Sequence, residues 1–378
     1  MAKILHIGKY FPPESGGIES VTQSLASGAT RAGHLVSIVC FTKLAQYREE
    51  DASGAQVVRV PSRMTLFSQP LSIRYLIICT ILARRVDIIH LHLPNILGLM
   101  CVLMLPTKKK LLVHWHSDIL NKGLLGKLIY PLELIALRRA DQIIATSQIY
   151  ADASVILSRF AKKIAIVPLG SPDLSERGPL GGISSAITEF IGNRRVILVV
   201  GRLVPYKGHR LLIQAAELVR PDAAIIIVGD GPLAEELKLC VERSAVSNRI
   251  LLAGSLEDDD LQELFRLADL FCLPSIDRAE AFGVVLLEAM AHGLPIVASA
   301  IPGSGVTWVN QHLVSGLNFR VGDPVSLAEA CNQILDSDEL ARTLGKGARQ
   351  RFLSNFTEGL SVNRVLRLYE NLIDTPGS

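Results

Sequence analysis

The chain alternates between short runs of apolar residues and longer segments in which apolar residues recur every three or four positions. In the first half, the short runs predict β-strands at residues 3–8, 35–41, 56–60, 86–90, 110–114, 142–145 and 164–167. The longer segments predict helices at residues 18–32, 71–85, 96–105, 124–139 and 148–160. Because strands and helices follow one another in turn, this pattern favours a parallel α/β sheet.

Residues 168–192 interrupt this alternation with a segment dense in Gly, Pro and Ser, which is typical of an interdomain linker. A second series of buried strands is predicted at residues 196–200, 224–228, 250–252, 270–273 and 295–298. The sequence therefore predicts two doubly wound domains, at residues 1–176 and 177–356, and a final helix within residues 357–378. Open sheets of this kind bind ligands beyond the carboxyl ends of their strands, so site residues are expected in those loops.

Composition agrees with two packed domains and argues against a membrane span. The 378 residues are 49% hydrophobic and 20% charged, and the longest apolar stretch, residues 71–89, is broken by three arginines and an aspartate. The first apolar run is too short for a signal peptide. The six cysteines are scattered without a C-x-x-C pair, which indicates buried free thiols in a reducing cytoplasm.

Residues 278–299, RAEAFGVVLLEAMAHGLPIVAS, combine two glutamates with a helix start. Good helix formers fill the run after Gly283, and the helix is expected to end before Gly293. Glu280 therefore precedes the helix, and Glu288 lies on its second turn. The first N–H groups of a helix bind phosphates, and a glycine lets a phosphate approach the backbone closely.

Two carboxylates in these positions suit a nucleotide sugar. Glu280 would accept hydrogen bonds from sugar hydroxyls, and Glu288 would hold a ribose diol with both of its oxygens. The backbone at the helix start would contact the donor at Ala281, Phe282, Gly283 and Val284. The alternative is a capped helix with two solvated glutamates.

A second motif, GRLVPYKG at residues 201–208, follows a predicted buried strand. Arg202 offers a planar fork of donors and Lys207 a point charge, so together they suit a diphosphate. Both cations would also stabilise the negative charge that grows on a departing nucleotide diphosphate. Gly201 belongs to the same donor-binding loop. The alternative is two solvated surface cations.

The loop after the first strand places Gly16 and Gly17 at the start of a helix, where they would cradle a phosphate of the donor or an acceptor. The loop lacks the G-x-G-x-x-G spacing of dinucleotide-binding proteins. No acidic residue ends the second strand, either. Both features count against an NAD enzyme.

Two other patterns admit a metal interpretation. The pairs His90-x-His92 and His114-x-His116 have the spacing of a zinc site, but no thiolate lies nearby. The run EDDD at residues 257–260 contains a D-x-D pattern, although its acids also suit the start of the helix that follows, where the dipole favours them. We expect no metal at either place.

The segment EAFGVVLLEAMAHGLPIVAS resembles the E-x7-E signature of retaining glycosyltransferases of the two-Rossmann-domain (GT-B) type, in family 4. GRLVPYKG resembles the G-R-x-x-x-x-K-G motif of the same family. The resemblance covers nearly the whole chain and is tightest over residues 196–320. It implies a GT-B fold, with two Rossmann-like domains facing across a cleft and the final helix crossing back onto the first domain.

The segment VHWHSD at residues 113–118 resembles the family's segment with a histidine beside the anomeric carbon of the donor. The resemblance implies that His116 stabilises an oxocarbenium-like centre, while His114 and the earlier pair are structural histidines with satisfied hydrogen bonds. It implies further that the nucleobase lies beside Ser255 and Leu256.

The mechanism that the resemblance implies needs neither a cofactor nor a metal. The donor diphosphate leaves beside Arg202 and Lys207, and the acceptor hydroxyl attacks from the same face. The leaving phosphate oxygen takes the proton of that hydroxyl. Glu280 orients the sugar and does not attack it, in contrast to a glycosidase carboxylate.

Three segments look most like bacterial mannosyl- or rhamnosyltransferases of O-antigen, lipopolysaccharide and exopolysaccharide assembly: IGKYFPPESGGIE, VHWHSD and SIDRAEAFGVVLLEAM. This likeness implies GDP-mannose or a GDP-deoxymannose as the donor and a lipid-linked oligosaccharide as the acceptor. A UDP-hexose donor stays open. So do a sugar-nucleotide epimerase of GT-B fold and a non-catalytic scaffold.

Charge is unevenly distributed along the chain. Residues 1–178 hold 21 Lys and Arg against 12 Asp and Glu, whereas residues 179–378 hold 18 against 24. The basic clusters at residues 84–85, 108–110, 138–139 and 162–163 would face an anionic membrane. The apolar face of residues 66–82 would add shallow insertion, unless that helix is buried in the core. We therefore expect a cytoplasmic protein, peripheral on the inner face of the cytoplasmic membrane, with no nucleic-acid partner.

Overall fold

The computed structural model describes residues 1–14, 16–44, 46–52, 54–62, 64–66, 69–105, 109–119, 123–175 and 183–374. The chain divides into two units. The N-terminal unit comprises Met1–Gly170 together with Glu358–Ser378, and the C-terminal unit comprises Ser171–Thr357. The boundary expected between residues 176 and 177 lies outside the described residues.

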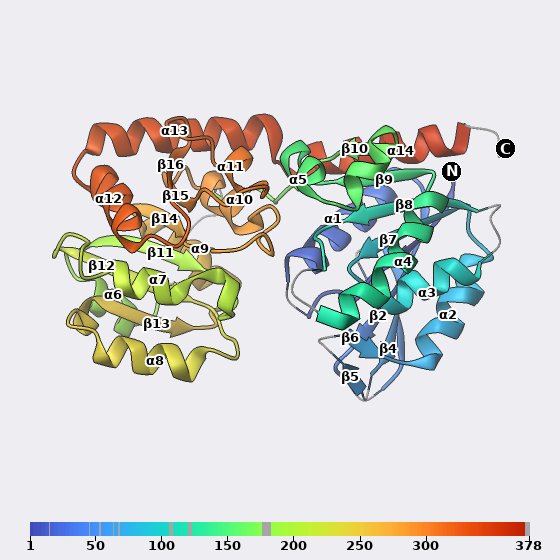
Figure 1. The fold of residues 1–378 in the computed structure, drawn as a ribbon, viewed down its shortest axis with the longest axis horizontal. Coiled ribbons are helices and arrows are strands. Elements are labelled where there is room, and N and C mark those ends of the chain that lie inside the picture. The colour runs from blue at the N-terminus through green and yellow to red at the C-terminus, as the bar shows by residue number, and fades with distance from the viewer. Residues whose placement is uncertain are drawn as a thin grey trace. The chain divides into compact units, whose positions relative to one another are not determined.

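The N-terminal unit is built on an eight-stranded sheet of order β10-β9-β8-β7-β1-β2-β4-β3 (Figure 1). All neighbouring strands are parallel except β3 and β4. The strands are β1 Lys3–Ile7, β2 Leu35–Thr42, β3 Arg48–Ala52, β4 Ala55–Pro61, β7 Ile88–Leu93, β8 Lys110–Trp115, β9 Gln142–Ala145 and β10 Ile164–Ile166, with a separate hairpin of β5 Met64–Leu66 and β6 Gln69–Leu71. The strand order reverses between β1 and β7, so the carboxyl ends of these two strands form the switch point of the sheet.

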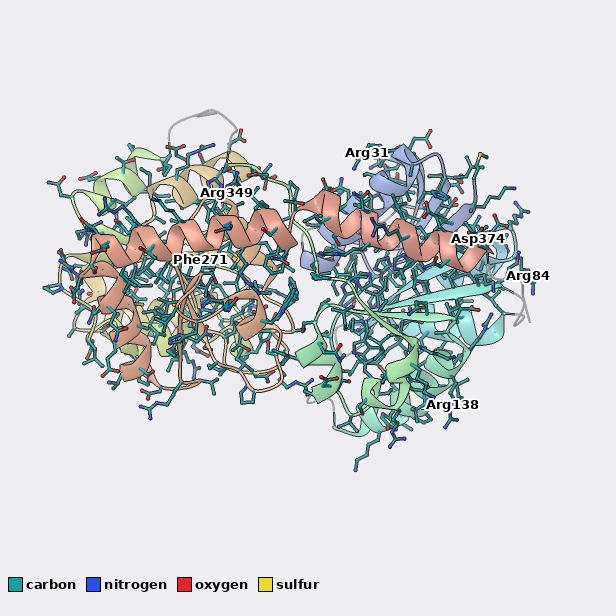
Figure 2. All side chains as sticks on the ribbon, turned by 90° about the horizontal axis from the view of Figure 1, so that it is seen from above. Arg31, Arg84, Arg138, Phe271, Arg349 and Asp374 are labelled. Carbon is teal, nitrogen blue, oxygen red and sulfur yellow. The ribbon has the colours of Figure 1, made fainter. Side chains whose placement is uncertain are left out.

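Helices cover this sheet, and three of them begin at side-chain caps. The helical segments are α1 Gly17–Arg31, α2 Ile73–Ala83, α3 Ile96–Met104, α4 Gly123–Arg139, α5 Gln148–Ala153, the 3₁₀ segment η1 Leu157–Lys163 and α14 Glu358–Asp374. Ser72, Asn95 and Ser147 accept hydrogen bonds from the first turns of α2, α3 and α5. The last helix, α14, packs along α1 (Figure 2), and Gly28 makes this approach possible because a Cβ there would collide with Val362.

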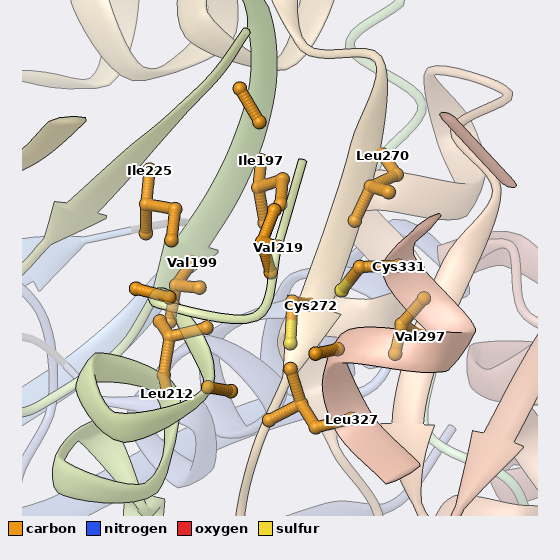
Figure 3. Close-up of a cluster of buried hydrophobic side chains, with 14 of the residues drawn as sticks. Ile197, Val199, Leu212, Val219, Ile225, Leu270, Cys272, Val297, Leu327 and Cys331 are labelled. Carbon is orange, nitrogen blue, oxygen red and sulfur yellow. The ribbon is translucent and has the colours of Figure 1, made fainter. Parts of the chain in front are cut away.

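The C-terminal unit contains a six-stranded, fully parallel sheet of order β13-β12-β11-β14-β15-β16. Its strands are β11 Arg195–Val200, β12 Ala223–Val228, β13 Ile250–Gly254, β14 Leu270–Leu273, β15 Ile296–Ser299 and β16 Gly316–Phe319. Sheets of this kind are buried on both faces, which explains the continuous apolar strands. Figure 3 shows part of the core on one face, where Cys272 of β14 and Cys331 pack among aliphatic side chains.

Helices and short 3₁₀ turns connect these strands. They are α6 Ser185–Ile191, η2 Pro205–Lys207, α7 His209–Ala215, α8 Ala234–Arg243, η3 Ser247–Arg249, α9 Asp258–Leu267, α10 Val284–Ala291, α11 Val306–Val309, α12 Pro324–Leu335 and α13 Asp338–Asn355. The six cysteines are free thiols, and all except the partly exposed Cys240 are buried, as expected. Among the described residues, no helix combines the length and the apolar character that crossing a bilayer requires.

The predicted strands and helices are confirmed within a few residues, with the following corrections. The charged strand β3, the hairpin of β5 and β6, and the short strand β16 were not predicted, because none is a long apolar run. The helix with the predicted apolar face at residues 66–82 begins only at Ile73. The helix predicted at residues 148–160 is divided into α5 and η1. The predicted linker at residues 168–192 contains α6.

Candidate functional site

The loop after β11 holds Lys207 in a fixed, largely buried place. Lys207 ends the 3₁₀ turn η2, and its Cε and Nζ lie over Gly201, 3.4 Å from where a Cβ would stand. Gly208 follows in the left-handed region (φ 71°), and a Cβ there would collide with the carbonyl oxygen of Pro274. The N–H of Ile276 donates to the carbonyl of Tyr206 at 2.8 Å. These contacts join the loop after β11 to the loop after β14, the neighbouring strand.

Glu280 lies in the loop after β14 and pairs with Lys207. The distance between Lys207 Nζ and Glu280 Oε2 is 2.7 Å, and the two side chains are 13% and 9% exposed. The Ser275 hydroxyl donates to the same oxygen at 2.8 Å. Burial is the largest single influence and lowers the pKa of Lys207, but Glu280, aided by Tyr206 and Glu288, raises it above its usual value. The ammonium group is therefore held charged in a poorly hydrated place.

The start of α10 agrees with the predicted helix start. Gly283 is the N-cap residue and is in the left-handed region (φ 79°), which favours glycine. Ala281 and Phe282 are buried, and the Phe282 ring packs against Trp308. The Phe282 side chain therefore belongs to the core, and only its backbone remains for a donor.

The remaining predicted residues of this unit differ in exposure. Arg202 and Ser255 are exposed, while Val284 and Leu256 are partly buried. Glu288 lies on α10 near Lys207, and its own burial, aided by Asp258, raises its pKa to about 7. The charge of Lys207 lowers the pKa of Glu288 and partly offsets this rise.

A cavity of about 330 Å³ opens at the carboxyl ends of β11, β12 and β13. It lies between these strand ends and helix α8, and its lining includes Leu203, Gly229, Asp230, Glu235, Lys238 and Gly254. Gly229 packs so closely on Gly201 that a Cβ would collide with its carbonyl. The turn GDGPL at residues 229–233 thus supports the loop that carries Lys207. The acids at residues 258–260 form the first turn of α9, as expected.

In the N-terminal unit, Gly17 begins α1 and Gly16 is its N-cap residue. A Cβ at Gly16 would collide with the carboxylate of Glu19, which occupies the space beside the helix start. Burial raises the pKa of Glu19. The buried Arg59 donates to the carbonyl of Phe11 and pairs with Glu14, so it fixes the loop between β1 and α1. Ser15 lies outside the described residues.

Five buried histidines gather on one face of β1, β7 and β8: His6, His90, His92, His114 and His116. The prediction that His114 has satisfied hydrogen bonds is wrong. Neither of its ring nitrogens has a partner among the described residues. Burial lowers the pKa of His116 to about 3, so its ring is neutral near pH 7.

Comparison with known proteins places both units in one family. Residues 183–351 match the family model of glycosyl transferases group 1, and residues 16–170 match that of the glycosyl transferase 4-like domain. The O-antigen chain mannosyltransferase C of Escherichia coli is 30% identical over 99% of each chain. This chain is a group 1 glycosyltransferase.

Two further likenesses agree with this assignment. The D-rhamnosyltransferase WbpZ of Pseudomonas aeruginosa is 28% identical to this glycosyltransferase over 94% of its chain and 92% of the relative's. The solved structure of a sucrose-phosphate synthase from Thermosynechococcus elongatus superposes with a TM-score of 0.81 over 99% of each chain, at 20% sequence identity. The fold is GT-B, with two Rossmann-like units, as the sequence predicts.

The structure of this glycosyltransferase adds residues that the sequence did not single out. Ser275 holds Glu280, and Arg59 holds the loop before α1. Tyr369 on α14 contacts both His90 and His6. Each of these contacts joins residues that are distant in sequence or unmarked by a motif, so no local signal predicts them.

Proposed function

We propose that this glycosyltransferase transfers mannose or a deoxymannose, with retention of configuration, from a nucleotide diphosphate sugar to a lipid-linked glycan. GDP-mannose or a GDP-deoxymannose is the proposed donor. The likeness to a mannosyltransferase over the full chain, and to a rhamnosyltransferase, supports the choice of sugar. The alternative donor is a UDP-hexose.

The observation that carries the proposal is the buried contact between Lys207 and Glu280. Within the part of the chain that the structure describes, Lys207 and Ser275 both bind Oε2 of this carboxylate. A carboxylate fixed in this way is a poor nucleophile, because its charge is already compensated. Its other oxygen, Oε1, suits a hydroxyl of the donor sugar, which agrees with an orienting role for Glu280.

The proposed reaction balances without an enzyme nucleophile. The bond between the anomeric carbon and the diphosphate oxygen breaks, and the acceptor oxygen bonds to the same face of that carbon. The acceptor proton passes to the leaving diphosphate oxygen. Lys207, the exposed Arg202 and the start of α10 stabilise the negative charge that develops there. These groups supply the charge that a divalent metal provides in other transferases, so we propose a metal-independent reaction without a cofactor.

An anionic membrane surface belongs to the same proposal, and helix α2 supports it. Ile73, Ile77 and Ile81 recur every four residues and are 78%, 53% and 45% exposed. Met104 of α3 and Leu128 of α4 are also exposed, and α3 packs against both α2 and α4 (Figure 1). The alternative that α2 is wholly buried is therefore wrong, and this apolar surface suits shallow insertion.

Basic residues accompany this apolar surface. Arg84 and Arg138 are exposed (Figure 2), as is Arg85. Two lysines of the basic clusters are engaged within the protein. Lys109 donates to the carbonyl of Val86, and Lys163 donates to the carbonyls of residues 138 and 140. Lys108 lies outside the described residues. The exposed arginines and the exposed Lys162 therefore carry the proposed attraction to acidic lipids.

Incubation with a panel of sugar nucleotides tests the function. The panel contains GDP-mannose, GDP-rhamnose, UDP-glucose and UDP-galactose, each with a polyprenyl-diphosphate-linked glycan. Release of GDP together with an α-linked product, identified by NMR, is the expected result. A β-linked product would exclude retention, and a UDP-specific reaction would replace the donor. Conversion of the sugar nucleotide without a glycoside product would indicate an epimerase. Absence of turnover with every donor would favour a scaffold.

A further inference from the structure

The five histidines of the N-terminal unit share one face of the sheet because of strand register. His6 pairs with His90 across β1 and β7, and His92 pairs with His114 across β7 and β8. Residues two positions apart in a strand point to the same side, which adds His116 to this face. Neighbouring ring centroids are 4.0–5.5 Å apart, and all these ring pairs are stacked except His6 and His90, which are tilted.

Four of these histidines and Tyr369 form a continuous series of hydrogen bonds, here called the histidine chain. His116 Nε2 lies 3.0 Å from His92 Nδ1, and His92 Nε2 lies 3.0 Å from His6 Nδ1. His6 Nε2 lies 3.3 Å from the Tyr369 hydroxyl. That hydroxyl lies 2.6 Å from His90 Nδ1. The histidine chain thus runs from His90 on β7 through Tyr369 on α14 and His6 on β1 back to β7 at His92. It ends at His116, which follows β8.

Each member of the histidine chain carries one proton. Burial lowers the pKa of His6 to about 3 and that of His92 and His90 well below the usual range, so these rings are neutral. Burial raises the pKa of Tyr369, so its hydroxyl stays protonated. A neutral imidazole with both nitrogens engaged donates with one and accepts with the other. All the bonds of the chain must therefore point in the same direction.

The contact with Tyr369 selects this direction. A separation of 2.6 Å is normal for a hydroxyl donor and short for an N–H donor, whereas 3.3 Å fits a weak N–H donor. Tyr369 therefore donates to His90 Nδ1 and accepts from His6 Nε2. The chain ends do not decide the matter. His90 Nε2 and His116 Nδ1 are equally buried and lack partners in the described residues, so either direction leaves one unpaired N–H.

We propose that Tyr369 is a positioning residue that, through His6 and His92, holds His116 as the Nε2–H tautomer. His116 Nδ1 is then a buried lone-pair acceptor, and a substrate hydroxyl that reaches it must donate to it. The consequence for turnover rests on the function proposed above, whereas the tautomer does not. A histidine that accepts at Nδ1 can orient a hydroxyl but cannot protonate the leaving group.

A metal is the competing occupant of this cluster. Ring nitrogens of His92, His114 and His116 lie within 4.8 Å of one another. Zinc binds imidazole nitrogens at about 2.0–2.1 Å, in line with their lone pairs. The rings of His114 and His116 are 4.0 Å apart and only 15° from parallel, so their lone pairs do not converge. The geometry favours the hydrogen-bonded chain over a shared metal.

Nitrogen-15 NMR of the histidine-labelled protein tests the proposal without any activity assay. Protonated and bare imidazole nitrogens differ widely in shift, and single His→Gln variants assign the signals. The expected result is Nε2–H in His6, His90, His92 and His116. Nδ1–H in any of these four would overturn the proposal. Stoichiometric binding of added Zn²⁺ at these nitrogens would overturn it as well.

Tyr369→Phe removes the hydroxyl but keeps the ring, so the histidines remain packed. We expect His116 to become a mixture of the two tautomers. Tyr75→Phe is the matched control, because Tyr75 is buried in the same unit and bonds the carbonyl of Gly8 at 2.6 Å. This control is expected to leave the histidine signals of the chain unchanged. An unchanged His116 in Tyr369→Phe, or the same change in both variants, would refute the role of Tyr369.

Kinetics separate this proposal from the proposed function. Tyr369→Phe is expected to lower kcat about fivefold, as the loss of one ordinary hydrogen bond does, with little change in donor KM. A changed His116 tautomer with an unchanged kcat would support the role of Tyr369 in the histidine chain and would remove His116 from catalysis. A protein that turns over no donor would refute the proposed transfer reaction. The NMR data would still show whether the histidine chain has the proposed tautomers.

Discussion

Replacing Lys207 with methionine separates the two contributions that the structure gives this side chain. Lys207 Nζ is 2.7 Å from Glu280 Oε2, and both side chains are nearly buried. A buried pair that loses one partner leaves an uncompensated charge, which costs about 3–5 kcal/mol. With a urea m-value of about 3 kcal/mol/M, the unfolding midpoint of the C-terminal unit falls by about 1 M or more.

Turnover is expected to fall for a different reason. The charge that Lys207 faces grows in the transition state, so its loss lowers kcat about 100-fold. Adding Glu280→Gln to Lys207→Met removes the uncompensated carboxylate, so the urea midpoint recovers while kcat stays low. Arg210→Met is the matched control. Arg210 and Glu236 form an ion pair in the same unit but are 61% and 38% exposed, so both measurements stay near the wild-type values.

Urea titrations followed by circular dichroism, and steady-state kinetics below the unfolding transition, provide the two measurements. A near-normal kcat in Lys207→Met would remove Lys207 from the mechanism. A double variant as unstable as the single variant would refute the argument from an uncompensated carboxylate. Similar losses in Arg210→Met would show that removing any cation from this unit has the same effect.

Three other predictions follow from the structure. EDTA is expected to leave transferase activity intact, and a loss that Mn²⁺ or Mg²⁺ restores would revive the Asp258-x-Asp260 pattern as a metal site. The protein is expected to co-sediment with phosphatidylglycerol vesicles at low salt and to be released at high salt. The double variant Ile73→Ser, Ile77→Ser should bind these vesicles more weakly. Protein that stays in the supernatant at low salt would contradict the proposed membrane binding. Because folding raises the pKa of Glu288 to about 7, its contribution to stability is present below the unfolded value of 4.5 and is lost as pH rises through 7. Glu288→Gln should therefore raise the melting temperature above that of the wild type at pH 8 more than at pH 5, and an equal difference at both would contradict the shift.

The parts of the site that the sequence predicted are those determined by a few consecutive residues. The start of α10 follows from Gly283 and the helix formers after it, and the turn that carries Lys207 follows from the glycines around it. The pairing of Lys207 with Glu280 was not predicted. It depends on β11 and β14 being neighbours in the sheet, although β12 and β13 lie between them in sequence.

The histidine chain illustrates the same limit more strongly. The two H-x-H pairs were visible in the sequence, and alternation along a strand placed each pair on one face. Predicting that His6 belongs to the histidine chain requires the register of β1 against β7. Predicting the same of Tyr369 requires that α14 packs on the N-terminal unit. The resemblance also implied satisfied hydrogen bonds for His114, whose ring nitrogens have no partner among the described residues. Strand β3, at the edge of the sheet, was missed because its charged sequence REEDA has no apolar pattern.

The two units prepare opposite electrostatic conditions for the proposed reaction. In the C-terminal unit, Glu280 keeps Lys207 charged despite burial, and a fixed cation is what a departing diphosphate requires. In the N-terminal unit, burial keeps His116 neutral, with a pKa of about 3. A positive imidazolium beside an oxocarbenium-like centre would repel the charge that develops there, whereas a neutral ring with a lone pair would not. Burial without a carboxylate partner is therefore the condition that the proposed role of His116 needs, and Tyr369 and His92 belong to the histidine chain without adding a charge to it.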